Sequence, residues 1–165
     1  MNVEELRAAQ APLKARYKND PASAQVTLHG RGSVDVPQQL CLVETFLGTT
    51  PAGLHPATGG DGKSACSADL LLQALVACAG VTLGAVATSM GITVRSGRIS
   101  AAGEVDFRGT LGVSREAPVG FKRITLGFEL DTDANPASLA KLLELTERYC
   151  VVYQTLKHPP ELSAG

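Results

Sequence analysis

The longest apolar stretch of the chain predicts a buried central helix. No Asp, Glu, Lys or Arg lies within residues 70–94, and a helix that is apolar all round is typical of a protein interior. Ser67 is a favourable N-cap, Asp69 suits the first turn and Gly91 suits the end. We therefore expect a helix over residues 67–90. It is long enough to span a bilayer, but the rest of the sequence lacks a membrane-protein pattern, so we expect no membrane partner.

Weaker patterns predict shorter elements on both sides of this helix. Apolar residues at helical spacing indicate an amphipathic N-terminal helix, and alternation of apolar and polar residues indicates four strands. We expect a helix over 3–17, strands over 24–29, 38–47, 95–107 and 121–131, a glycine-rich loop over 48–66, a last helix with Asn135 as N-cap and Pro136 first, and a loose tail. The last helix has an apolar face of Leu139, Leu142, Leu143, Thr146, Tyr149, Cys150 and Tyr153. Strand pairs without regular β-α-β alternation indicate an α+β fold.

The length of 165 residues suits one structural domain with a substantial core. We expect the amphipathic helix to occupy a segment of its own, residues 1–20, because Asp20-Pro21 ends it. The remaining residues, 21–165, then form the domain. The N-terminal segment is charged and has no apolar signal-peptide core, so we expect a cytoplasmic protein with reduced cysteines.

Charge and motif spacing argue against several classes of function. The 15 basic and 16 acidic residues give a net charge of −1, which argues against a nucleic-acid partner. Residues 57–64, ATGGDGKS, come close to a phosphate-binding loop, but Ala57 replaces the first glycine and no buried strand is expected before it. The cysteines at 41, 66, 78 and 150 have no C-x-x-C spacing, so we expect no metal.

Cys78 stands inside the apolar helix and has two possible roles. A free cysteine is often a small buried hydrophobe, and it is also a nucleophile that a protein can shield from bulk water. A Cys–His hydrolase would need a histidine such as His55 turned toward Cys78, and no local signature supports this. By spacing alone, core packing of Cys78 and Cys150 is the more ordinary role.

The segments around Cys78 and Cys150 resemble two signatures of one family. The stretch DLLLQALVACAGVTL resembles the helix E-L-L-x-A-A-L-A-A-C of the OsmC/Ohr proteins, which are osmotically induced and organic hydroperoxide resistance thiol peroxidases. The stretch CVVYQTL, from Cys150, matches their second signature, C-P-V-S-N-T-L. The two motifs lie in the order of the family, and their separation of 72 residues is close to that usual in the family. The resemblance covers roughly residues 24–157.

This resemblance implies a fold and an assembly. Family members have antiparallel sheets packed around a long buried central helix, and they form intertwined homodimers with both sites at the interface. A stripe of small residues on the central helix would permit close contact with a partner copy. The stripe consists of Ala77, Gly80, Gly84 and Thr88.

The resemblance also implies an activity, that of a peroxiredoxin-like hydroperoxide reductase. Cys78 would attack an organic hydroperoxide, or hydrogen peroxide, and become a sulfenic acid. Cys150 would condense with it to a disulfide, which an external dithiol would reduce. No other cofactor is expected. Such an activity would belong to an antioxidant stress response. The apolar surroundings of Cys78 would admit organic peroxides.

A cation should lower the pKa of a nucleophilic cysteine in an apolar wall. The family takes it from an arginine in the loop between the first two strands, which corresponds to Arg31, with Arg16 as second candidate. A glutamate before the central helix orients that arginine, and Asp69 stands near its place. On a regular helix, however, Asp69 faces away from Cys78, roughly 13 Å along the axis. A plain first-turn acid is the better interpretation of Asp69.

The sequence departs from the family at positions that follow the second cysteine. Val151, Tyr153 and Gln154 stand where the family has Pro, Ser and Asn, so the resolving region is expected to be shaped differently. Cys66 has no family role and is either a spare thiol or an alternative resolving partner. A non-enzymatic alternative remains open, in which a dimeric module binds an apolar small molecule in the same pocket.

Overall fold

The computed structural model describes all 165 residues and divides into two compact units. The first unit contains residues 1–27, 75–100 and 127–165, and the second contains residues 28–74 and 101–126. The segment boundary expected at residue 20 stays a prediction. Each unit is described by itself.

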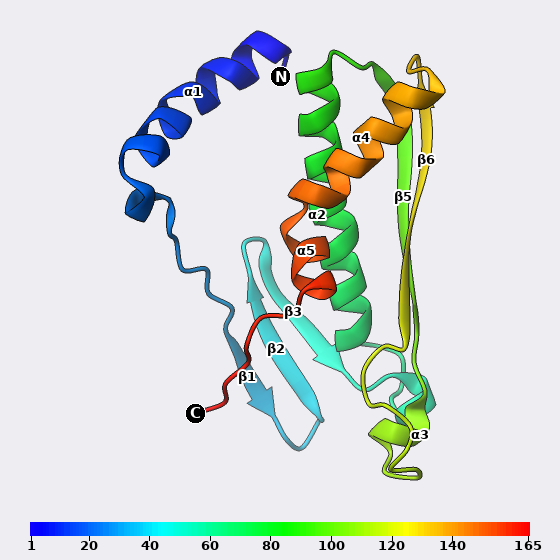
Figure 1. The fold of residues 1–165 in the computed structure, drawn as a ribbon. Helices are drawn as coiled ribbons and strands as arrows, with labels where there is room; N and C mark the ends of the chain where they lie inside the picture. The colour runs from blue at the N-terminus through cyan, green and yellow to red at the C-terminus, as the bar shows by residue number, and fades with distance from the viewer. The chain divides into compact units, whose positions relative to one another are not determined.

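The order of elements confirms the α+β class (Figure 1). The helices are α1 (Val3–Asn19), α2 (Ser67–Met90), α3 (Phe107–Thr110), α4 (Pro136–Tyr149) and α5 (Val151–Lys157), with short 3-10 helices η1 (Pro21–Ala24) and η2 (Pro56–Thr58). The strands are β1 (Gly32–Asp35), β2 (Leu40–Thr45), β3 (Gly48–Gly53), β4 (Ala65–Cys66), β5 (Val94–Glu104) and β6 (Arg123–Thr132). The central helix, the N-terminal helix, the β5–β6 pair and the cap of α4 by Asn135 thus follow the sequence pattern.

The strand expected over residues 24–29 is wrong. Residues 25–31 form no strand, and β1 begins at Gly32 and pairs antiparallel with β2. The alternation of this segment had suggested a buried face, but Val26 and Leu28 are 74% and 86% exposed. Because no sheet or core receives these side chains, the local pattern gains no tertiary support.

The loop expected over residues 48–66 is also wrong in part. It contains β3, which pairs antiparallel with β2, and β4, which pairs parallel with β3. The turn between β2 and β3 is tight because Gly48 adopts a φ of 119°, and the Thr45 hydroxyl donates to the Gly48 carbonyl at 2.6 Å. The second unit therefore holds a four-stranded sheet in the order β1-β2-β3-β4. Its last pair departs from the antiparallel pattern.

The core of the first unit forms where α2, α4, β5 and β6 meet. Buried residues of α2 recur every four positions, which places them on one face of the helix: Leu75, Ala79, Leu83 and Ala87. Leu83 and Ala87 pack with Leu142 of α4, and Phe128 and Leu130 of β6 join them. This cluster anchors α4 on α2.

A second face of α2 is uncovered within the chain. Val81 is 77% exposed, and a Cβ at Gly84 would meet no atom within 4 Å. By contrast, a Cβ at Gly80 would lie 3.3 Å from Ile99, so that glycine borders β5. By length and composition α2 could also cross a membrane, but one such helix is weak support for a membrane protein because core helices of soluble proteins share these properties.

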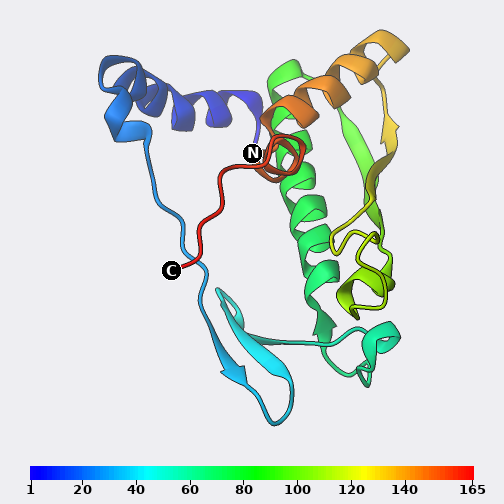
Figure 2. The same cartoon turned by 60° about the horizontal axis from the view of Figure 1, so that its bottom comes forward.

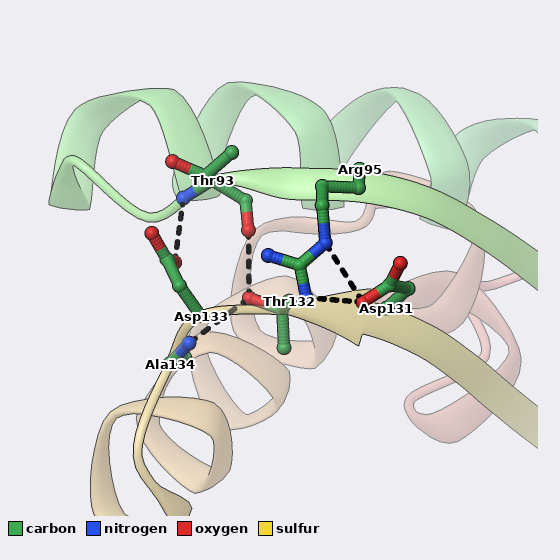
Figure 3. Close-up of polar contacts among 6 residues, drawn as sticks. All are labelled: Thr93, Arg95, Asp131, Thr132, Asp133 and Ala134. Carbon is green, nitrogen blue, oxygen red and sulfur yellow. Dashed lines mark hydrogen bonds and ion pairs between the residues drawn. The ribbon is translucent and has the colours of Figure 1, made fainter.

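Polar contacts tie the start of β5 to the end of β6, just before α4 (Figure 3). The Thr132 hydroxyl donates to the Thr93 carbonyl at 2.8 Å, and the Thr93 amide donates to Asp133 at 3.1 Å. Arg95 pairs with Asp131 across the strands, with its Nε 2.9 Å from the carboxylate. These contacts fix the point from which the chain enters α4.

The last helix expected from the sequence is two helices. α4 ends at Tyr149 and α5 begins at Val151, because Cys150 has the extended angles φ −75° and ψ 110°. In Figure 2, α5 is seen nearly end-on while α4 runs across the view, so the chain turns sharply at Cys150. Beyond Lys157 the chain has no regular structure, as expected of the tail.

Candidate functional site

Cys78 lies in the middle of α2, at the edge of its buried face. Its neighbours on that face, Leu75 and Ala79, are buried, and the Cys78 side chain is half-buried. Thr82 follows one helical turn later, so its side chain lies next to Cys78 on the helix surface. α2 thus holds the thiol at the boundary between core and surface.

Cys150 forms the corner between α4 and α5 and has no exposed surface. Its amide donates to the Thr146 carbonyl at 3.0 Å, which closes α4. Its sulfur accepts the Tyr153 amide at 3.4 Å, and its carbonyl accepts the Gln154 amide at 2.9 Å, which opens α5. The residue is therefore the C-cap of one helix and the N-cap of the next, and its side chain has little freedom.

The corner places Cys150 and the start of α5 close enough to Cys78 to change its pKa. Burial raises the pKa of the Cys78 thiol, while hydrogen bonds lower it. The groups that lower it are, from the largest effect to the smallest, the Val152 amide, the Cys150 side chain, the Val151 amide and the Thr82 side chain. The bonds outweigh burial, so the pKa of Cys78 lies below the ordinary value of a cysteine.

The pKa of Cys150 moves in the opposite direction. Burial raises it, the Tyr153 amide lowers it, and the hydrogen bond to Cys78 together with the negative charge of Cys78 raises it further. The net pKa of Cys150 lies above the ordinary value. Of the two thiols, Cys78 is therefore the one that loses its proton more readily. A thiolate is the nucleophilic form of cysteine.

A polar bridge spans the corner from α4 to α5. The Tyr153 hydroxyl donates to the Glu147 carboxylate at 2.9 Å, and the Gln154 side-chain amide donates to the Glu147 carbonyl at 2.8 Å. Burial raises the pKa of Tyr153, and the Glu147 carboxylate raises it further. Tyr153 therefore stays a donor at neutral pH, and both bonds hold α5 against the last turn of α4.

The other predicted site residues belong to α1, to the first turn of α2 and to the segment before β1. Arg31 is exposed and immediately precedes β1, where its carbonyl accepts the Glu44 amide at 2.9 Å. Asp69 is exposed in the first turn of α2. Because α2 already begins at Ser67, regular helix geometry places Asp69 on the side away from Cys78, which favours the interpretation as a first-turn acid. Arg16 lies at the end of α1, 5.1 Å from the centre of the Tyr17 ring. Their roles stay predictions.

Cys41, Cys66 and His55 belong to the second unit and have local surroundings of their own. Both cysteines are half-buried, free thiols in β2 and β4. The His55 ring stacks on Phe107 with centroids 5.0 Å apart, and its Nδ1 accepts the Ala57 amide at 3.0 Å. No three His, Cys, Asp or Glu side chains come together as a metal site.

Sequence reasoning named the two cysteines, whose catalytic roles stay predictions, and it did not name the groups that change their pKa values. Thr82 could have been found, because four residues is the spacing of neighbours on a helix. The Val151 and Val152 amides leave no signal in side-chain identity. Their availability depends on the break at Cys150, which the continuous apolar face concealed. Glu147 had no signal at all, because its partner Tyr153 was assigned to the apolar face.

Comparisons with solved structures find the same fold in several proteins. An OsmC-like protein from Mycoplasma pneumoniae superposes with a TM-score of 0.69 at 14% identity, covering 82% of this chain and 90% of that chain. An organic hydroperoxide resistance protein OsmC from Legionella pneumophila has a TM-score of 0.63 at 15% identity, covering 81% and 93%. The organic hydroperoxide resistance protein OhrB of Bacillus subtilis has a TM-score of 0.54 at 15% identity, again covering 81% and 93%.

Because the sequence identity is so low, these structures support a shared fold and nothing further. A comparison with curated protein sequences finds no match. The family of OsmC-like proteins matches residues 60–164, a stretch that includes both α2 with Cys78 and the corner with Cys150. Because this match covers more than half of the sequence and the fold agrees with it, the chain belongs to the OsmC-like protein family.

Proposed function

We propose that this protein is a thiol-dependent peroxidase that reduces organic hydroperoxides with Cys78. The observation that carries the proposal is the contact of Cys78 with Cys150, in which the pKa of one thiol is lowered and that of the other raised. This is the division of roles that a peroxidatic and a resolving cysteine need. The family supports it, since some solved structures with this fold are organic hydroperoxide resistance proteins.

The first step is a two-electron oxidation of Cys78. Its thiolate attacks one peroxide oxygen, the O–O bond breaks, and the alkoxide leaves and takes up a proton to become the alcohol. Cys78 is then a sulfenic acid. The apolar residues around Cys78 on α2 favour an alkyl hydroperoxide over a charged one, and hydrogen peroxide would enter by its small size.

The second step forms a disulfide. The Cys150 thiol loses its proton and attacks the Cys78 sulfur, and the sulfenic oxygen departs as water. An external dithiol then reduces the disulfide by exchange, becoming a disulfide itself. No other cofactor is required, because peroxide supplies the oxidising equivalents and the dithiol supplies the reducing ones.

Arg31 is the proposed cation that favours the Cys78 thiolate further, with Arg16 as the second candidate. Both are permanently charged at neutral pH. Asp69 is retained as a candidate to orient Arg31, although its place in the first turn of α2 favours the simpler role. Cys66 remains the alternative resolving thiol.

The proposed working form is a cytoplasmic homodimer. The uncovered face of α2, with Val81 exposed and space over Gly84, is the kind of apolar small-residue surface that a second copy would cover. No nucleic-acid or membrane partner is proposed.

The decisive test treats the reduced protein with one equivalent of an alkyl hydroperoxide. Two thiols should disappear with the loss of two hydrogens of mass, and peptide mapping should join the Cys78 and Cys150 peptides. Cys150→Ser should accumulate sulfenic acid at Cys78, which excess peroxide drives to sulfinic acid. Cys78→Ser should abolish peroxide consumption. Cys41→Ser is the control and should behave as wild type.

Two other outcomes would change the assignment. A Cys66–Cys78 linkage would show that the resolving thiol is Cys66 and would leave the nucleophile unchanged. If Cys78 stayed reduced while the peroxide was untouched, the enzyme would be excluded, and the binding of an apolar small molecule would take its place.

A further inference from the structure

The corner at Cys150 is held by side chains that do not belong to the reacting pair. Tyr153 and Gln154 of α5 both bond to Glu147 of α4, one to its carboxylate and the other to its carbonyl. We call these three residues the corner bridge. Two bonds that end on one residue fix both the distance and the angle between the two helices, because α5 cannot swing without breaking at least one of them.

The angle of α5 decides where its first residues point. The groups that act on the Cys78 thiol include the Val151 and Val152 amides and the Cys150 side chain, and all three come from the corner or from the residues just after it. α2, which carries Cys78, is anchored to α4 by the core cluster around Leu83 and Leu142. A movement of α5 relative to α4 is therefore also a movement of these donors relative to the Cys78 sulfur.

We propose that the corner bridge of Glu147, Tyr153 and Gln154 is a positioning device that holds the Cys150 corner on Cys78 and thereby sets the reactivity of that thiol. Tyr153 and Gln154 stand where the family signature has Ser and Asn, so the chain builds its own support at these positions. The three residues act through the corner and do not touch the peroxide. The inference rests on the proposed function for its purpose, although the coupling itself is a property of the thiol.

The bridge also explains why a tyrosine suits a position beside the active site. The Tyr153 side chain is half-buried, and a buried hydroxyl without a partner is unfavourable. Its bond to Glu147 satisfies the hydroxyl. The Lys157 ammonium lies 5.6 Å from the centre of the Tyr153 ring.

The test measures the pH dependence of Cys78 alkylation by iodoacetamide in the full-length reduced protein, by mass spectrometry of the Cys78 peptide. Tyr153→Phe removes the hydroxyl and keeps the ring. We expect the pH midpoint to rise by about half a unit, which lowers the thiolate fraction at pH values below the midpoint about threefold. Gln154→Ala should shift it in the same direction, and Tyr153→Phe with Gln154→Ala should shift it less than the sum, because both act through one angle.

Tyr149→Phe is the matched control. It removes a hydroxyl from an exposed tyrosine at the same corner but outside the bridge, so the midpoint should stay at the wild-type value. Glu147→Gln should keep the midpoint closer to wild type than Glu147→Ala, because the amide oxygen of Gln still accepts from Tyr153. A midpoint that is unchanged in both Tyr153→Phe and Gln154→Ala, in variants whose circular dichroism is that of wild type, would overturn the proposal.

Alkylation separates this inference from the proposed function. If wild type consumes no peroxide while Tyr153→Phe still raises the midpoint, the bridge positions the thiol of a protein with another task. If peroxide is consumed and the midpoints coincide, the enzyme stands and the bridge serves only the packing of two helices.

Discussion

At the scale of the residue, Cys78 is surrounded by hydrogen-bond donors from two helices. The Thr82 and Cys150 side chains and two backbone amides of α5 offset the effect of burial on its pKa. These groups are neutral, and they lower the pKa of Cys78 although burial raises it. They therefore favour the thiolate without a cation, and Arg31 is proposed to favour it further.

This leads to a prediction for the pH dependence of the thiol. Because the pKa of Cys78 is lowered, its alkylation should rise with pH through a midpoint below that of an ordinary cysteine. Thr82→Val removes one donor and should raise the midpoint by about half a unit. Arg31→Ala should raise it further if Arg31 is the activating cation, and Arg16→Ala should do so if Arg16 is.

Thr88→Val provides the control for Thr82, since the Thr88 hydroxyl bonds within α2 to the Gly84 carbonyl at 2.9 Å. In the Thr88→Val variant, the pH midpoint of Cys78 alkylation should equal that of wild type when it is measured by stopped flow. If Thr88→Val shifted the midpoint as much as Thr82→Val, both substitutions would act through helix stability and not through the contact of Thr82 with Cys78.

At the scale of the element, sequence pattern predicted those parts whose periodicity and caps agree. The apolar run gave α2 from Ser67 to Met90, and Asn135 caps α4 by accepting the Ser138 amide at 2.9 Å. The sequence pattern did not predict the break at Cys150, because apolar residues continue at helical spacing on both sides of it. Tertiary contacts of the corner, which no local window contains, decide that the helix turns there.

The glycine-rich segment illustrates the same limit. Its composition suggested a loose loop, yet the Gly60 amide bonds to the His55 carbonyl at 3.1 Å, and a Cβ at Gly60 would overlap the carbonyl oxygen of Leu54. The loop is therefore closely packed at this glycine, where any side chain would displace the backbone that follows β3.

We accordingly expect Gly60→Ala to lower the free energy of unfolding by roughly 1–3 kcal/mol, because the methyl group has no space. Gly120→Ala is the matched change, since a Cβ there would meet nothing within 4 Å, and it should be nearly neutral. Urea denaturation followed by circular dichroism measures both. Equal stabilities would contradict the close packing at Gly60.

At the scale of the whole molecule, α2 has more apolar surface than its own chain covers. Leu75, Ala79, Leu83 and Ala87 face the core, whereas Val81 is open. The two family signatures let the sequence predict the fold class and the two cysteines. The sequence could not show which face of α2 packs in the core of its own chain and which face stays exposed, because the residues of both faces are apolar.

The proposed dimer predicts the effect of a charge on that face. Wild type should have the mass of two chains in native mass spectrometry at micromolar concentration. Val81→Arg should weaken the dimer by at least about 2 kcal/mol, because an unpaired charge would be buried in the interface. Val113→Arg, at a residue that is 71% exposed outside α2, should leave the mass unchanged. A monomeric wild type would contradict the dimer.

The complete burial of Cys150 has a consequence for the lifetime of the oxidised protein. In the proposed disulfide, the sulfur that an incoming thiolate can reach is that of Cys78, since Cys150 has no exposed surface. Attack there must expel Cys150, whose raised pKa makes it the poorer leaving group, whereas attack on Cys150 would expel the better one. Access and leaving-group ability thus oppose each other. Monothiols, even when abundant, would therefore reduce this disulfide slowly. A dithiol would reduce it faster, because its second thiol resolves the mixed disulfide by forming a ring and releasing the protein thiol.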